Sequence, residues 1–205
     1  MITTRIDALE IKELNVFENG GVYHININAA IDAPAENVHK VLTDYKHLYH
    51  LNPSIVESRV LPSPDKKAVR VKTRISNCVL IFCMELYRTE DVYELSSNHL
   101  RTIIVPSLSN FSSGRSDWKI EPQGEHSQVI YEGLLEPDFE VFPIIGPPII
   151  KAKLRKELVV SLTKTECIAK MQQELDWNIH LQVASIDIHK LCDEKCTNDT
   201  GQCTQ

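Results

Sequence analysis

The chain has 205 residues, 24% of them charged and 42% hydrophobic, with a net charge of −6 at pH 7. This balance is typical of a folded domain that buries a substantial core, and the acidic surplus argues against a nucleic-acid partner, which usually contacts a basic surface. No run of 18 apolar residues occurs, so stable membrane insertion is not expected.

Residues 1–19 are predicted to form an N-terminal arm outside the main domain. Residues 1–13 carry scattered charges and are expected to be loose or partly helical, and Leu14–Phe17 is compatible with a short strand. The arm has no apolar stretch of the kind that a secretory signal contains. A cytoplasmic location with free thiols is therefore expected.

Residues 22–45 predict a strand followed by a helix. From Val22 to Ile31 every second residue is apolar, which is the alternation of a half-buried strand. Asp32–Glu36 then provides a capping residue, a proline suited to the first helical turn and an acid that favours a helix N-terminus. Apolar residues at helical spacing follow up to Tyr45, and residues 46–53 are expected to hold a second short helix or turn.

A series of strands is predicted to follow these helices. Polar clusters rich in Pro, Ser, Asn, Asp and Gly separate the strands, as in hairpin connections between antiparallel neighbours. The seven further strands are expected at Ile55–Leu61, Ala68–Ile75, Val79–Tyr87, Asp91–Leu95, Leu100–Val105, Ser112–Ile120 and Gln128–Leu135.

Pro147–Glu174 is predicted to form one long helix. Its apolar residues recur at helical spacing and its opposite face is rich in lysine, for which a solvated face is favoured over contact with an anionic membrane. Such a helix would be about 40 Å long, enough to cross a small domain. The order of elements predicts an α+β fold in which a curved antiparallel sheet wraps around this helix, with two short helices after the first main strand.

The connection Glu136–Pro148 is unusually apolar for a segment between two elements, and it includes Phe139 and Phe142. An apolar connection usually folds over another part of the molecule. Two interpretations stay open for it. It could be a lid over a cavity, or a small satellite core beneath a loop.

Three stretches, Ala30–Val38, Val41–Tyr45 and Leu51–Leu61, together with the closing helix, resemble the START-like or birch-pollen-allergen-like helix-grip superfamily. Within it the chain is most similar to the polyketide cyclase/dehydrase and lipid-transport group. The resemblance covers roughly residues 20–173, and it implies a domain at 20–174 with a hydrophobic cavity between sheet and helix. Residues 175–205 would form a C-terminal extension, partly disordered, whose first part could be strand or helix.

No pattern for nucleophilic catalysis, phosphate binding or a catalytic metal is recognised in the sequence, and no cofactor is expected. In the extension, His189, Cys192, Cys196 and Cys203 are residue types that ligate Zn²⁺, but their spacing matches no paired CxxC arrangement. A disordered tail is the favoured interpretation. Cys167, inside the helical pattern, is interpreted as a small buried hydrophobe.

The candidate ligand-binding residues are those expected on the concave side of the sheet, in the apolar connection and on the inner face of the long helix. Small residues beside Trp118 and Tyr131, such as Gly114 and Gly133, leave space that fits a cavity wall, although core packing is favoured over ligand contact for both aromatics. The full set is Ile27, Tyr45, Val71, Thr73, Phe82, Met84, Ile103, Trp118, Tyr131, Phe139, Phe142, Ile150, Leu154 and Leu158.

This set favours binding or transport of a hydrophobic small molecule, such as a lipid, a quinone or a polyketide-like compound, without catalysis. Two alternatives remain. One is an aromatase/cyclase-like enzyme that acts on a polyketide. The other is a non-catalytic interaction module that forms a homodimer through the C-terminal extension. Fold by itself does not decide among them.

Overall fold

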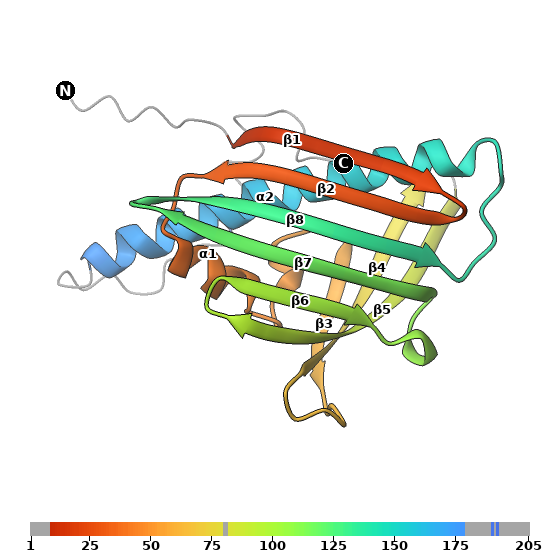
Figure 1. Cartoon of the computed structure of the whole chain (residues 1–205), viewed down its shortest axis with the longest axis horizontal. Helices are drawn as coiled ribbons and strands as arrows, with labels where there is room; N and C mark the ends of the chain where they lie inside the picture. The colour runs from red at the N-terminus through yellow and green to blue at the C-terminus, as the bar shows by residue number, and fades with distance from the viewer. Residues whose placement is uncertain (1–8, 80–81, 179–189, 191, 193–205) are drawn as a thin grey trace.

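The computed structural model describes residues 9–79, 82–178, 190 and 192. Within these residues, eight strands form one curved sheet, and a long helix runs along its concave side (Figure 1). In chain order the elements are β1 (Glu10–Asn19), β2 (Val22–Ile31), α1 (Ala35–Leu42), the 3-10 turn η1 (Leu48–His50), β3 (Ile55–Leu61), β4 (Val69–Val79), β5 (Phe82–Ser96), β6 (His99–Ile104), η2 (Pro106–Leu108), β7 (Phe111–Gln123), β8 (His126–Pro137) and α2 (Gly146–Asn178).

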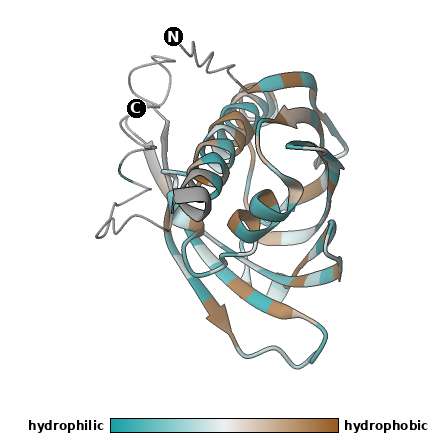
Figure 2. Cartoon of the chain, turned by 90° about the vertical axis from the view of Figure 1, so that its left-hand side faces the viewer, coloured by the Kyte–Doolittle hydropathy of each residue, from teal (hydrophilic) through white to brown (hydrophobic). Residues whose placement is uncertain are grey.

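The sheet is antiparallel throughout, in the order β1-β2-β8-β7-β6-β5-β4-β3. Strands β3 to β8 follow one another as successive neighbours, and β8 returns to pair with β2. The chain passes from β2 to the far edge of the sheet at β3 through α1 and η1, and the sheet curves around α1 and α2 (Figure 2). The predicted α+β helix-grip fold is therefore confirmed.

Strand β1 corrects the prediction for the N-terminus. It pairs with β2 from Glu10, opposite Ala30, to Asn19, opposite Val22. Residues 10–13 are therefore strand rather than a loose or helical arm, and the short strand expected at 14–17 is longer at both ends. The apolar alternation of β1 is weak, and its backbone hydrogen bonds come from β2, a partner that local pattern does not reveal. Residues 1–8 lie outside the described part of the chain.

The two strands predicted at 79–87 and 91–95 are one strand, β5. It pairs with β4 from Phe82 to Val92 and with β6 from Glu90 to Ser96. The pattern was misleading because two inward-facing positions of β5 hold charged residues, Arg88 and Glu90, which interrupt the apolar alternation. Arg88 and Glu90 form an ion pair with each other, and Thr102 of the neighbouring strand β6 donates to Glu90.

Helix α2 is hydrogen-bonded to both edges of the sheet. On the β1 side, Arg155 donates from its guanidinium to the Val16 carbonyl at 2.8 Å. On the β3 side, the Asn52 amide donates to Ser161 Oγ at 3.1 Å, and Ser54 Oγ donates to a Glu157 carboxylate oxygen at 2.8 Å. These contacts hold the helix across the open side of the curved sheet. Among the described residues, no helix is long and apolar enough to span a bilayer.

The packed core lies at one end of the concave side, where the second half of α2 meets α1, β2 and the ends of β7 and β8. Its fully buried members include Ile31, Val38 and Leu162. Asn37 on α1 ties the two helices together, because its amide donates to the Ala169 carbonyl at 3.3 Å. The second half of α2 therefore carries the main structural contacts of the helix.

A cluster of charged groups accompanies this core. The Asp32 carboxylate pairs with the Lys170 ammonium and lies 2.6 Å from Nδ1 of His126, and the hydrogen bond from Lys170 is the main cause of the lowered pKa of Asp32. Asp32 thus contacts α2, and no side chain caps α1. Nearby, burial raises the pKa of Glu166 to about 7, against the opposing effect of Lys170. Oε2 of Glu166 has no hydrogen-bond partner among the described residues.

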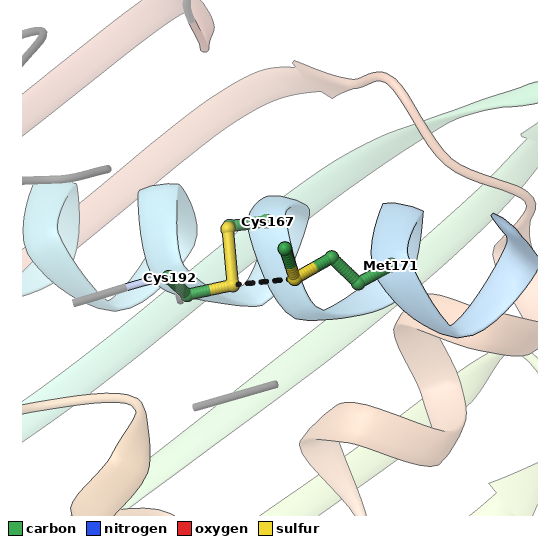
Figure 3. The surroundings of a disulfide bond; sticks show 3 residues. All are labelled: Cys167, Met171 and Cys192. Atoms are coloured by element: carbon green, nitrogen blue, oxygen red, sulfur yellow. Dashed lines mark hydrogen bonds between the residues drawn. A yellow bond between two sulfur atoms is a disulfide. The ribbon is translucent and has the colours of Figure 1, made fainter. Parts of the chain in front are cut away.

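A disulfide joins Cys167 on α2 to Cys192, and the Cys192 sulfur lies 3.5 Å from the sulfur of Met171 (Figure 3). Cys192 is buried and belongs to the hydrophobic core. The prediction of free thiols is therefore wrong for this pair, and the bond removes Cys192 from the set of four residues considered as Zn²⁺ ligands. The other members of that set lie outside the described residues, as does most of the extension through which the alternative homodimer would form. Helix α2 continues to Asn178, so the extension begins as helix rather than strand.

Candidate functional site

The concave side divides into a packed end and a more accessible end. From Gly146 to Val159, the first half of α2, every residue is half-buried or exposed, whereas buried residues become frequent from Val160 onward. Opposite this first half, inward-facing residues of the sheet such as Trp118, Leu135 and Leu86 are only half-buried. The first half of α2 therefore leaves the facing part of the sheet partly accessible to solvent.

A connected chain of polar side chains crosses this accessible part of the sheet on four neighbouring strands. Arg88 and Glu90 of β5 form an ion pair, with Nε 3.1 Å from Oε2. Thr102 of β6 donates to Oε1 of Glu90 at 2.9 Å, and its hydroxyl oxygen lies 2.9 Å from Oγ of Ser116 on β7. Ser116 is in turn hydrogen-bonded to the hydroxyl of Tyr131 on β8. Every hydroxyl in the chain has a partner, with the Glu90 carboxylate as the final acceptor.

Tyr131 is the end of this chain nearest the core. Burial raises the pKa of the Tyr131 phenol to about 12, although the positive charge of Arg88 acts in the opposite direction. The phenol therefore stays protonated at neutral pH. Its ring packs against Trp118 of β7, with the ring centroids 4.4 Å apart.

Two glycines make room for side chains at this site. A Cβ atom added at Gly133 would lie 2.5 Å from the Tyr131 hydroxyl, and one added at Gly114 would lie 2.6 Å from Cγ1 of Ile104. The space predicted beside the two aromatics is thus partly filled by Tyr131 itself and by Ile104. The absence of a side chain at Gly133 leaves room for the phenol of Tyr131, and its absence at Gly114 leaves room for Ile104.

A second polar contact joins the segment after α1 to the sheet. The Tyr45 hydroxyl donates to Oε1 of Glu94 on β5 at 3.0 Å, and Nε2 of His39 lies 3.9 Å from Oε2 of the same carboxylate. Burial, followed by the negative charge of Glu94, raises the pKa of Tyr45. Glu94 lies about 13 Å further along β5 than Glu90. Tyr45, predicted as a ligand contact, therefore lies apart from the polar chain.

Other predicted residues on the sheet fall into distinct environments. Ile27, Val71 and Thr73 face inward but are fully buried by the surrounding structure. Met84 faces inward on β5 and is 47% exposed. The prediction for Ile103 is wrong. Leu100 and Ile104, at even positions of β6, are buried on the inner face, so Ile103 lies on the outer face. The side chain of Phe82 lies outside the described part.

The predicted ligand-binding residues that follow the sheet in the chain also lie in different environments. Phe139 packs edge-on against Phe111, with ring centroids 6.3 Å apart. Phe142 is wrong as a cavity residue, because 67% of its surface is exposed. Ile150, Leu154 and Leu158, the predicted residues of α2, are half-buried and follow one another at intervals of about one turn.

Sequence reasoning missed Arg88, Glu90, Thr102 and Ser116 as site residues. The first two fell in a presumed break between two strands. A signal was present in the sequence nonetheless. Residues 86, 88, 90 and 92 lie on one face of the strand, because side chains alternate at a period of two. Charged residues on the inward face, such as Arg88 and Glu90, indicate a polar site.

A separate pocket of about 660 Å³ lies at the other end of the molecule, beside the start of α1. A hydrogen bond of 3.0 Å from Gln173 to Glu125 joins two of its walls. None of the predicted ligand-binding residues lines it. In the part of the chain that the structure describes, no group of three or more His, Cys, Asp or Glu residues is arranged to hold a metal ion.

The curved sheet closed by a long C-terminal helix defines a START-like helix-grip protein, and comparison with known proteins places it in a family. Residues 24–171, more than half of the chain, match the family described as polyketide cyclase / dehydrase and lipid transport, and the chain belongs to that family. This confirms the resemblance inferred from the sequence. A search of curated proteins gives no significant match.

Solved structures agree on the fold. The Zhui aromatase/cyclase from Streptomyces sp. R1128 has a TM-score of 0.61 at 13% identity, over 74% of this chain and 96% of that one. A START superfamily protein from Mycobacterium smegmatis has a TM-score of 0.54 at 19% identity, over 74% and 98%. Human STARD10 has a TM-score of 0.56 at 12% identity, over 82% and 78%. These similarities describe the architecture that the chain shares with them.

Proposed function

We propose that the protein binds a hydrophobic or amphipathic small molecule, of the lipid, quinone or polyketide-like kind, and releases it unchanged. The site would lie between the first half of α2 and the facing strands of the sheet. The observation that carries the proposal is the combination found there: apolar side chains along α2 and at Trp118, next to one connected chain of polar groups. Ligand sites typically combine an apolar lining with a few well-placed polar groups.

The polar chain narrows the chemistry of the ligand. The Arg88 guanidinium is already paired with Glu90, and Tyr131 is a neutral phenol, so the chain has little net charge. Bringing a carboxylate or phosphate into this region would require an unpaired cation to offset the loss of its hydration. A neutral hydrogen-bonding group, such as a hydroxyl or a carbonyl, fits better.

An aromatase/cyclase-like reaction is the second candidate, because the same polar chain contains groups that can move protons. A general base needs a pKa near the working pH and an oxygen or nitrogen that is free to accept a proton. Glu90 is already engaged by Arg88 and Thr102, and Tyr131 keeps its proton at neutral pH. These features favour binding over catalysis.

Native mass spectrometry of the purified protein, followed by organic extraction of any bound compound, tests the proposal directly. We expect a co-purified amphipathic molecule with a neutral polar group, recovered unaltered. Recovery of a chemically altered derivative after incubation with a polyketide would favour the enzyme instead.

A matched pair of variants locates the site. Leu154→Trp places a large ring on the half-buried face of α2, whereas Ala152→Trp places the same ring on the exposed face of the same helix. With Nile red as a neutral apolar probe, we expect Leu154→Trp to weaken binding by at least about tenfold, since an occupied volume excludes the ligand. Ala152→Trp should bind as the wild type does. Equal binding by all three proteins would place the probe elsewhere and contradict the proposed site.

A further inference from the structure

The segment that leads into α2 carries an exposed apolar patch, defined here as Phe142, Ile144, Ile145 and Ile149. Their exposed fractions are 67%, 87%, 62% and 41%. Neither a closed lid nor a satellite core would leave these side chains in water. An exposed cluster of large apolar side chains on a protein surface usually marks an interaction site.

The backbone of this segment is unusually poor in free hydrogen-bond donors. Pro143, Pro147 and Pro148 have no N–H group, and the N–H of Gly146 donates to the Phe142 carbonyl at 2.8 Å. The first turn of a helix normally presents several unpaired N–H groups, which are costly to remove from water. Here most of the cost of removing unpaired N–H groups from water is absent, so the start of α2 and the segment before it can enter an environment with little water.

Basic residues follow the patch directly. Lys151, Lys153, Arg155 and Lys156 occupy the next part of α2, and no acidic residue lies between Val141 and Lys156, although the whole chain has a net charge of −6. Among the described residues, only Lys153 of these four pairs with a carboxylate, that of Glu157 at 2.6 Å. Arg155 donates to a backbone carbonyl and keeps its charge.

The apolar and basic groups also share a face. Ile149 and Lys156 are both exposed, and their spacing of seven residues brings them to one side of the helix. An exposed apolar tip with cations one to two turns behind it is the arrangement of an interfacial membrane contact, in which apolar side chains enter the headgroup region and cations meet anionic lipids.

We propose that the exposed apolar patch and the basic residues behind it dock the protein on the surface of an anionic phospholipid bilayer. A second copy of the chain is the poorer occupant, because apposing two such patches would bring together two clusters of positive charge. The contact is peripheral, consistent with the absence of a membrane-spanning helix among the described residues. This inference goes beyond the proposed ligand binding and does not depend on it.

Vesicle flotation with the full chain tests the proposal. We expect the wild type to float with vesicles of phosphatidylcholine and phosphatidylserine, and to stay in solution with phosphatidylcholine alone. Binding should weaken at high salt, since the Debye length falls to about 3 Å at 1 M. The triple variant Phe142→Ser, Ile144→Ser and Ile145→Ser should lose at least about tenfold in partitioning, because three large apolar side chains no longer enter the bilayer.

The charge contribution is tested separately with Lys156→Glu. This change reverses one charge, and each cation near an anionic surface contributes about fivefold to binding, so we expect a loss of more than about tenfold. A control variant, Leu95→Ser and Leu134→Ser, removes two exposed apolar side chains on the sheet and should float as the wild type does. Circular dichroism and Nile red binding show that each variant remains folded.

Two results would overturn the proposal. The first is wild-type protein that stays in solution with anionic vesicles at low salt, or a triple variant that floats as well as the wild type. The second is a concentration-dependent mass in light scattering without lipid that the triple variant abolishes, since the patch would then be a contact between two copies. Nile red binding, measured in parallel, reports the proposed ligand site independently of either result.

Discussion

Replacing Cys192 by alanine tests whether the disulfide to Cys167 holds the C-terminal region onto α2. The bond joins residues separated by 25 positions. In the chain-entropy treatment, a cross-link over that separation destabilises the unfolded state by about 3.5 kcal/mol, and native disulfides typically contribute about 2–4 kcal/mol. Cys192 is also buried in the core, so the variant loses packing as well. We expect the free energy of unfolding to fall by about 2–4 kcal/mol.

Urea unfolding followed by circular dichroism measures this change. The oxidised wild type should unfold at a clearly higher urea concentration than both the reduced wild type and Cys192→Ala, and Cys203→Ala serves as the matched control. Differential alkylation should label the peptides of Cys167 and Cys192 only after reduction. If the oxidised and reduced wild type and Cys192→Ala share one unfolding midpoint, the bond does not stabilise the fold and the reasoning is refuted.

Two further predictions follow from buried groups. Gly133→Ala should cost about 1–3 kcal/mol of folding free energy, because the new Cβ meets the Tyr131 hydroxyl at 2.5 Å. In a Tyr131→Ala background the same change should cost little, and a full penalty there would contradict the proposed clash. For Glu166, the folded-state pKa of about 7 is above the ordinary value of 4.5, so folding is favoured most at low pH and this contribution is lost as the pH rises from about 4.5 through about 7. Glu166→Gln should therefore flatten the fall in stability over that range in urea unfolding at several pH values, and an unchanged pH profile would show that burial of Glu166 is not its cause.

Elements with a strong local pattern could be predicted from the sequence. The strands at Val22–Ile31 and Ile55–Leu61 have the predicted bounds, because alternating burial and flanking turn residues are both local properties. The long helix could be predicted as well, because its prolines and apolar spacing mark a helix start without reference to the rest of the fold. It begins at Gly146, one residue before the predicted start at Pro147. The resemblance to the family came from the residues of Ala30–Val38, Val41–Tyr45 and Leu51–Leu61 together with the closing helix.

The predictions that failed depended on partners distant in sequence. Arg88 and Glu90 interrupt the apolar pattern of β5, yet they remain in the strand because they pair with each other and with Thr102 on β6. Ile103 was assigned to the wrong face of its strand, since the buried side of β6 is set by the elements packed against it.

The sequence by itself therefore determined the class of fold and the long helix, which lies along the concave side of the sheet. Tertiary structure decided which side chains meet there. The polar chain that ends at Tyr131 needs hydroxyl and charged groups from four strands to lie side by side, and the Cys167–Cys192 bond needs two cysteines 25 positions apart to approach each other. Strand register and helix packing create that proximity, and neither is encoded in the local periodicity of any one segment.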